Sequence, residues 1–384
     1  MQAFQVQDTP CFYITEQAEL VSMVEQLADQ PLLAVDTEFL RTNTFYPIVG
    51  LIQIASSEVC YLIDPLSCES LEPLRKLLLN NSKRLVMHAC SEDIEVLQRI
   101  FGALPDTVFD TQIAASMVSR DHQLGLQRLI STYCGIDIPK DETRSDWTKR
   151  PLTENQMVYA ALDVVLLLKV YDALADKLSE TGRMSWCEEE CQRVIEGYRH
   201  ATPADLYYRT IGDAWKLKGK KLQVLQALAE WREIQAHERD KPRGFIFSDR
   251  ELFAIADQLP RSNVQLSQVA KLKPVQIRRY GEPAIDLIDR VMSEEQAPLD
   301  PVPKPFNNQT KKVVKAIKPE VEKLAIELDM ATDRLSNRRN LEKLVTSLIE
   351  QRPLPNYYEG WRQLELVPRL RVAVEKYAAA HPQS

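Results

Sequence analysis

The stretch LLAVDTEFLR (32–41) places two carboxylates, Asp36 and Glu38, directly after a run of apolar residues. The apolar run predicts a buried strand, and residues two apart in a strand point to the same face. Two carboxylates held this close repel each other, and a divalent cation between them is a common way to keep both charged. A bare Asp-x-Glu also occurs at solvated strand ends, so the pair indicates a metal site only if further acids join it.

Two further aspartates lie in comparable settings. Asp93 stands in HACSEDIEVL (88–97), in the first turn of a predicted helix, where compensation of the helix dipole is an alternative explanation. Asp163 interrupts the apolar stretch MVYAALDVVLLL (157–168), and Tyr159 precedes it by four residues on the same helix face. Because an unpaired buried aspartate costs several kcal/mol, Asp163 is expected to face water, a cation or a metal, or to have a buried hydroxyl or arginine partner.

The four carboxylates and the tyrosine together have the composition of a two-metal phosphoryl-transfer site. Carboxylate oxygens are the hard ligands that Mg²⁺ or Mn²⁺ prefers. In such a site one ion activates the attacking water and the other stabilises the leaving 3′-oxygen. We expect Asp36 to bridge both ions and Tyr159 to orient or deprotonate the water.

The elements expected around these residues form a mixed sheet with helices on its faces. Apolar runs at 31–39, 48–56 and 59–64 predict an antiparallel meander, and alternating helix and strand patterns from 70 to 110 predict a βαβα continuation. Ser91 is expected to N-cap the helix that ends at Gly102. One long helix is expected over 153–180.

The strand signal disappears after about residue 200, and two helical blocks of similar construction follow, which predicts a degenerate tandem repeat. A segment with four prolines separates them. The predicted domains are a nuclease domain at 1–205, a first helical domain at 206–293, a linker at 294–310 and a second helical domain at 311–384.

The motif order Asp-x-Glu, Asp, Tyr-x3-Asp resembles that of the DEDDy 3′→5′ exonucleases, whose fold is an α/β ribonuclease H-like domain. The flanking words DTEF, GLIQIA, HACSEDIEVL, FDTQIAA and SDWTKRPLTENQMVYAALDV resemble the bacterial ribonuclease D family in particular, and the helical blocks resemble HRDC domains. The resemblance implies that Asp36, Glu38, Asp93 and Asp163 bind two divalent ions and that Tyr159 positions the nucleophilic water. It also implies removal of 3′ nucleotides from precursor tRNAs and other small structured RNAs, with release of 5′-mononucleotides.

Several other residues are candidate RNA contacts, each with a structural alternative such as packing or an internal hydrogen bond. The charged loop 141–151 contains an aromatic ring and cations, a combination suited to single strands. The lysine- and arginine-rich stretches at 216–221, 239–245 and 336–340 could contact the RNA backbone or be solvated helix ends. The individual candidates are Gln53, His88, Trp147, Lys149 and Arg150.

Charge is divided unevenly along the chain, whose net charge is −7. Residues 1–200 carry 17 Lys and Arg against 30 Asp and Glu, while residues 201–384 carry 31 against 25. An acidic half that binds metal and a basic half that binds a polyanion fit this division. No apolar run is long enough for a membrane span and no secretory signal is recognised, so a cytoplasmic monomer with seven reduced cysteines is expected.

Three functions agree with these observations. The first is a metal-dependent 3′→5′ exoribonuclease acting on single-stranded 3′ ends. The second is a DNA exonuclease with the same site, because the same acids serve both polymers. The third is a nucleic-acid-binding module whose nuclease domain is inactive, although all five site positions are present. The sequence contains no G-x4-G-K-[S/T] phosphate loop, which argues against a helicase.

Overall fold

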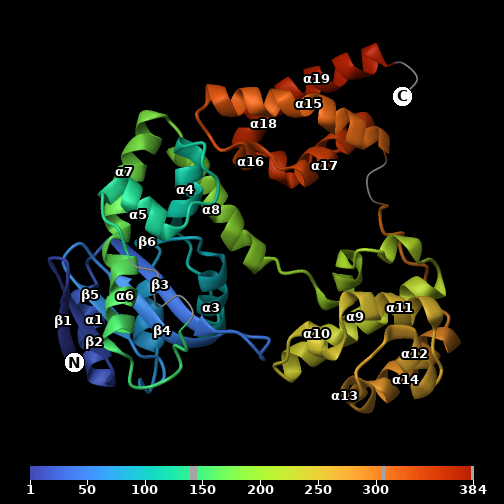
Figure 1. Ribbon diagram of the computed structural model, residues 1–384, viewed down its shortest axis with the longest axis horizontal. Helices are drawn as coiled ribbons and strands as arrows, with labels where there is room; N and C mark the ends of the chain where they lie inside the picture. The colour runs from blue at the N-terminus through green and yellow to red at the C-terminus, as the bar shows by residue number, and fades with distance from the viewer. Residues whose placement is uncertain (139–144, 305–307, 382–384) are drawn as a thin grey trace. The chain divides into compact units, whose positions relative to one another are not determined.

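The computed structural model describes residues 1–138, 145–304 and 308–381 (Figure 1). These residues form two compact units. The first consists of 1–40 and 48–199 together with the described part of 306–384, and the second consists of 41–47 and the described part of 200–305.

A seven-stranded mixed sheet is the centre of the first unit, with strand order β1-β2-β5-β4-β3-β6-β7. The strands β5, β4 and β3 pair antiparallel, as the predicted meander requires, whereas β6 and β7 continue the sheet in parallel from β3. A hairpin of β1 and β2, which the sequence pattern did not predict, adds the far edge. The strands are β1 (Gln2–Val6), β2 (Thr9–Ile14), β3 (Leu32–Leu40), β4 (Ile48–Ala55), β5 (Cys60–Ile63), β6 (Arg84–Met87) and β7 (Val108–Asp110).

Helices cover both faces of the sheet, as Figure 1 shows. One face packs against α1 (Gln17–Gln26), α2 (Glu72–Leu78) and α3 (Ser91–Phe101). The other face packs against α4 (Thr111–Val118), α5 (Leu126–Cys134), α6 (Glu154–Val165) and α7 (Leu167–Glu180), and α8 (Met184–Arg199) follows beside β7.

The alternation along β3 determines where its acids lie. Leu33 and Val35 belong to the core under α1 to α3, while Ala34 belongs to the core under α4 to α7. Asp36 and Glu38 are in step with Ala34, so they are on the face that α6 covers.

The helix ends differ from prediction at two places. The expected single helix over 153–180 is two helices, α6 and α7, which meet at the fully buried Leu166. Ser91 is the first residue of α3 and not its N-cap. The N–H groups of Ala89 and Cys90 just before α3 instead donate to the Asp110 carboxylate, at 3.1 and 2.9 Å. No side chain caps α3, whereas Asp110 is the N-cap of α4 and joins the residues before α3 to that helix.

The two helical blocks contain no strand among their described residues, in agreement with the prediction. The first contains η1 (Ala204–Thr210), η2 (Ala214–Lys216), α9 (Lys220–Glu238), α10 (Arg243–Ile246), α11 (Asp249–Gln258), α12 (Asn263–Ala270), α13 (Pro274–Gln276), η3 (Ile277–Gly281) and α14 (Glu282–Ser293). The second contains α15 (Asn308–Glu327), α16 (Thr332–Leu335), α17 (Arg338–Ile349), η4 (Asn356–Tyr358), α18 (Trp361–Glu365) and α19 (Val367–Ala380). Each contains a long helix, of 19 and 20 residues, followed directly by a helix of 4 residues, which supports the predicted repeat. Helix α15 begins inside the segment predicted as linker.

Buried charges attach the second helical block to α8. Glu190 on α8 is 5% exposed, and its carboxylate accepts hydrogen bonds from Arg362, which is 0% exposed, and from the Trp361 indole at 3.3 Å. Trp361 also stacks on Trp186 of α8, with ring centres 4.8 Å apart. Burial alone would raise the pKa of Glu190, but Arg362 and the neighbouring arginines lower it below the ordinary value. This block is thus fixed to the nuclease fold by an ion pair excluded from water.

None of the helices in the described chain combines the length and apolar character that a membrane crossing requires.

Candidate active site

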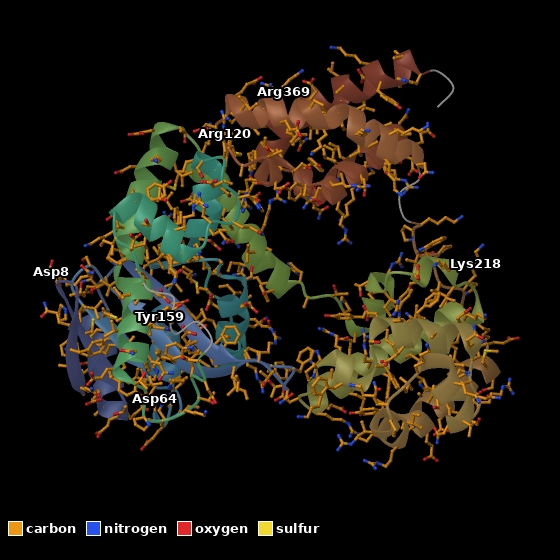
Figure 2. All side chains as sticks on the ribbon, viewed as in Figure 1. Asp8, Asp64, Arg120, Tyr159, Lys218 and Arg369 are labelled. Carbon is orange, nitrogen blue, oxygen red and sulfur yellow. The ribbon has the colours of Figure 1, made fainter. Side chains whose placement is uncertain are left out.

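Three carboxylates from two elements converge on the face of the sheet under α6. Asp36 and Glu38 of β3 and Asp163 of α6 each offer an oxygen, and these oxygens lie within 4.8 Å of one another. The pairing of β3 with β4 is irregular between Glu38 and Phe39, directly beside the group. Tyr159 belongs to the same helix as Asp163, and Figure 2 labels it on α6, which packs against the sheet.

The charges in this group repel one another. Burial raises the pKa of Asp36 to about 6. Burial, followed by the charges of Asp36, Asp163 and Asp93, raises the pKa of Glu38 to about 10. The pKa of Asp163 is raised as well, by burial and by Asp36. The three carboxyl groups cannot easily all be ionised at once, because their charges repel one another. A divalent cation bound between their oxygens would relieve this repulsion, so the group fits a metal site.

Asp93 lies beside this group and not within it. It is buried in the first turn of α3, where its Oδ1 accepts a hydrogen bond from Thr37 Oγ1 at 2.5 Å. Burial and the charge of Asp36 raise its pKa. The structure thus brings together three of the four predicted metal ligands, and it holds the fourth close enough to affect the pKa of Glu38.

Tyr159 lies one helical turn before Asp163. Its pKa is raised by burial and by the charges of Asp163, Glu38 and Asp36, so the phenol keeps its proton near neutral pH. A protonated phenol donates a hydrogen bond and does not act as a base. Of the two roles expected for Tyr159, orienting a water is therefore the one that this environment favours.

The loop that follows the undescribed residues 139–144 packs under Tyr159. Trp147 is 2% exposed, with its ring centre 6.2 Å from that of Tyr159. Arg150 Nε and Nη2 donate to the two oxygens of Asp64, each at 2.6 Å, and Nη2 also donates to the Gly50 carbonyl at 2.6 Å. Trp147 and Arg150 therefore hold the loop against the sheet.

The other candidate RNA contacts have varied surroundings. Lys149 is exposed, 3.7 Å from Asp146. His88 shares a hydrogen bond of 2.9 Å with Thr111, and burial lowers its pKa. Gln53 is opposite Asp36 in the β3–β4 ladder and fully buried, and its amide finds no hydrogen-bond partner among the described residues. RNA contact by these residues stays a prediction.

Sequence reasoning missed two polar groups that shape the site. Thr37 points away from the face of Asp36, so strand alternation gave no reason to connect it with Asp93. Asp64 follows the apolar strand β5, and an acid at the end of a buried strand was the available signal. Both groups act through hydrogen bonds to residues more than 50 positions away.

Comparison with known proteins identifies the family to which the chain belongs. A family model described as 3′-5′ exonuclease matches residues 11–179, and an HRDC domain model matches residues 221–288. The ribonuclease D of Pseudomonas paraeruginosa is 37% identical over 366 residues, which cover 94% of this chain and 97% of the relative. The chain belongs to the ribonuclease D family. The ribonuclease D of Escherichia coli is 33% identical over 372 residues, covering 95% of this chain and 98% of that relative.

The fold agrees with that membership. The crystal structure of E. coli RNase D matches with a TM-score of 0.89 and 31% identity, over 97% of this chain and all of that one. The predicted family, the mixed-sheet exonuclease domain followed by helical regions, and the 3′→5′ exoribonuclease activity are thereby confirmed. The acidic group fits the divalent-metal dependence of the exonuclease family. HRDC identity for residues 308–381, beyond the HRDC match, stays a prediction.

Proposed function

We propose that this member of the ribonuclease D family trims single-stranded 3′ ends of structured RNAs, including precursor tRNAs, and releases 5′-mononucleotides by two-metal hydrolysis. The observation that supports it most is the convergence of Asp36, Glu38 and Asp163, with carboxylate oxygens within 4.8 Å, beside a protonated tyrosine. The E. coli relative of known structure is described as an exoribonuclease involved in structured RNA processing.

Each residue has a definite part in this mechanism. Asp36, Glu38 and Asp163 would hold the divalent ions, Mg²⁺ or Mn²⁺, and Asp93 with its Thr37 partner would complete the ligand set. When bound, the ions lower the pKa of the attacking water and neutralise charge on the phosphate and the leaving oxygen. The Tyr159 phenol donates a hydrogen bond that orients the water. The water oxygen gives up one proton and forms a bond to phosphorus, the bond from phosphorus to the 3′-oxygen breaks, and that oxygen takes up one proton in exchange.

A gel time course tests the proposal. An RNA with a 5′ label, a stem and a short 3′ tail is incubated with Mg²⁺, with EDTA and with the Asp163→Asn variant, and a DNA version is run in parallel. Asp176→Asn on the exposed face of α7 is the matched control. We expect a descending ladder on RNA that needs metal and Asp163 and stops at the stem.

Other outcomes of that time course would reject the proposal in distinct ways. Equal ladders on RNA and DNA would point to an exonuclease without sugar preference. No ladder on either polymer would favour a binding module with an inactive nuclease domain. Cleavage that persists in Asp163→Asn would remove that residue from the mechanism.

The physiological ions, a cytoplasmic location and a monomeric state are further parts of this proposal. Metal preference is measured by repeating the time course with Mg²⁺ and Mn²⁺, and sedimentation of the purified protein measures its oligomeric state.

A further inference from the structure

Gln53, in β4, is a polar side chain enclosed in the core of the nuclease fold. It is 0% exposed, and within residues 1–138, 145–304 and 308–381 neither its amide nitrogen nor its amide oxygen has a hydrogen-bond partner. Arg193, Arg232 and Glu233 also have an unbonded buried atom, but each takes part in hydrogen bonds through its other atoms. A buried amide with neither atom bonded is unfavourable, so its presence requires an explanation.

The sheet places this amide directly beside a proposed metal ligand. Gln53 is opposite Asp36 in the antiparallel ladder of β3 and β4, and opposite Leu62 in the ladder of β4 and β5. The side chains of opposite residues lie on one face of a sheet, with Cβ atoms about 5 Å apart. Asp36 is therefore the polar one of the two residues that flank Gln53, and a glutamine amide is long enough to reach a carboxylate at this spacing.

Apolar side chains surround the rest of Gln53. Leu51 and Ala55 lie on the same face of β4, and both belong to the core under α4 to α7. Helix α6, which packs on β3, β4 and β5 (Figure 1), adds Ala160 and Val164 to that core. None of these side chains can form a hydrogen bond with the amide, which leaves the acidic site on the same face as the source of a partner.

A second buried polar group without a partner lies at the same site. Trp147 is 2% exposed, its indole N–H donates to no acceptor in the described part of the chain, and its ring centre is 6.2 Å from that of Tyr159. Gln53 thus borders the site at Asp36, and Trp147 borders it at Tyr159. Such an arrangement is expected where an ion and the water of the site supply the hydrogen bonds.

Glutamine suits this position chemically. Its amide nitrogen can donate to a carboxylate, and it adds no charge to a group whose carboxylates already repel one another. Carboxylates that bind metals are commonly hydrogen-bonded by a further residue that fixes their orientation. Loss of that further residue typically weakens metal binding by about 10- to 100-fold.

We propose that Gln53 is a positioning residue of the metal site. When an ion is bound, its Nε2 donates a hydrogen bond to the Asp36 carboxylate, which then keeps a fixed orientation, and its Oε1 accepts one from water of the site. This inference rests on the proposed function in one respect, namely that the acidic group binds divalent ions. Because Gln53 is fully buried, this role is favoured over direct contact with RNA.

Titration of the full-length protein with Mn²⁺, followed by the electron paramagnetic resonance signal of the free ion, tests the proposal. The variants are Gln53→Met and Gln53→Leu, which keep a side chain of similar size without the amide. Gln223→Met is the matched control, because Gln223 is 5% exposed in α9 and its amide donates to the Ala297 carbonyl at 3.0 Å. Urea unfolding in EDTA measures the stability of each protein without metal.

We expect both Gln53 variants to bind Mn²⁺ about 10-fold or more weakly than wild type. In EDTA their urea midpoints should be no lower than that of wild type, because they remove an amide that has no partner. The control should show the reverse, with unchanged Mn²⁺ affinity and a lower urea midpoint, since it loses a bonded amide. In the gel time course, a higher Mn²⁺ concentration should restore trimming by the Gln53 variants, with an unchanged KM for RNA.

Wild-type Mn²⁺ affinity in both Gln53 variants would overturn the proposal, and a raised KM for RNA in the same variants would assign Gln53 to RNA contact instead. A lowered urea midpoint in both would also overturn it, because the amide would then be bonded without metal. Wild type that trims RNA while the variants bind Mn²⁺ normally refutes only this inference. Mn²⁺ binding that depends on Gln53, in a wild type that does not trim RNA, refutes only the proposed function.

Discussion

Replacing Glu38 with glutamine should stabilise the metal-free protein, even though it removes a proposed metal ligand. The folded state holds a proton on Glu38 much more tightly than the unfolded chain does, with a pKa of about 10 against an ordinary value of 4.5. The folded protein therefore loses stability as pH rises from 4.5 towards 10, because the unfolded state gains by ionising first. Glutamine does not titrate, so the variant escapes this loss.

The size of the gain follows from the pH. Each pH unit above the unfolded pKa of 4.5 is worth about 1.36 kcal/mol until the folded pKa is reached. The expected advantage of Glu38→Gln in free energy of unfolding is thus below about 1 kcal/mol at pH 5 and on the order of several kcal/mol at pH 8. With the metal ion at 100 times its Kd, binding should raise the free energy of unfolding of wild type by about 2.7 kcal/mol, a gain that the variant lacks because it has lost a ligand.

Urea unfolding in EDTA at pH 5, 6.5 and 8 measures this difference. Glu58→Gln, in the exposed turn between β4 and β5, is the control and should show no pH-dependent gain. A Glu38→Gln protein that is no more stable than wild type at pH 8 would refute the argument from charge repulsion. So would a gain of the same size at every pH, because that would point to packing and not to ionisation.

Three further outcomes are expected. Gly50→Ala should lower the free energy of unfolding in urea by about 1–3 kcal/mol and reduce RNA trimming, because the new Cβ would lie 2.5 Å from the Trp147 carbonyl oxygen. Gly125→Ala, which has open space around its Cβ position, serves as the control. Glu190→Gln should lower the free energy of unfolding by about 3 kcal/mol at pH 7, since it leaves Arg362 buried without its counter-charge, and an unchanged value would contradict the role given to this pair. The pKa of Glu190 is lowered in the folded state, so the stability that its charge contributes is present above the ordinary pKa of 4.5 and is lost as pH falls through the folded value. The free energies of unfolding of wild type and Glu190→Gln should therefore become equal at acidic pH, which acid unfolding curves measure.

The acids of the site could be predicted because each breaks a simple local pattern. Asp36 and Glu38 share a face by the two-residue period of a strand, and Asp163 interrupts an apolar helix. The four-residue spacing to Tyr159 follows from the helix alone. Sequence spacing could not show that Asp93 lies beside the group of three and not within it. Nor could it show that Asp93 accepts a hydrogen bond from Thr37, which lies on the opposite face of the strand from Asp36.

Parts of the fold escaped prediction for physical reasons. The β1–β2 hairpin includes Pro10, a residue that weakens a strand pattern and is tolerated because it lies near the start of β2, before the pairing of β2 with β5 begins at Cys11. The break between α6 and α7 at Leu166 has no glycine or proline to mark it, and the apolar pattern continues across it. The contact between Glu190 and Arg362 joins residues 172 positions apart, and no local period encodes such a pair.

The contact between Glu190 and Arg362 also determines which truncations of the protein can be interpreted. A deletion that removes α18 and α19 would strip Glu190 of Arg362 and expose the Trp186 ring face that Trp361 covers. The loss of RNA binding in such a truncated protein would mix a missing surface with a damaged nuclease fold. The terminal block is therefore a structural component of the nuclease and not a detachable module, and point substitutions on its surface are the appropriate means of assigning its role.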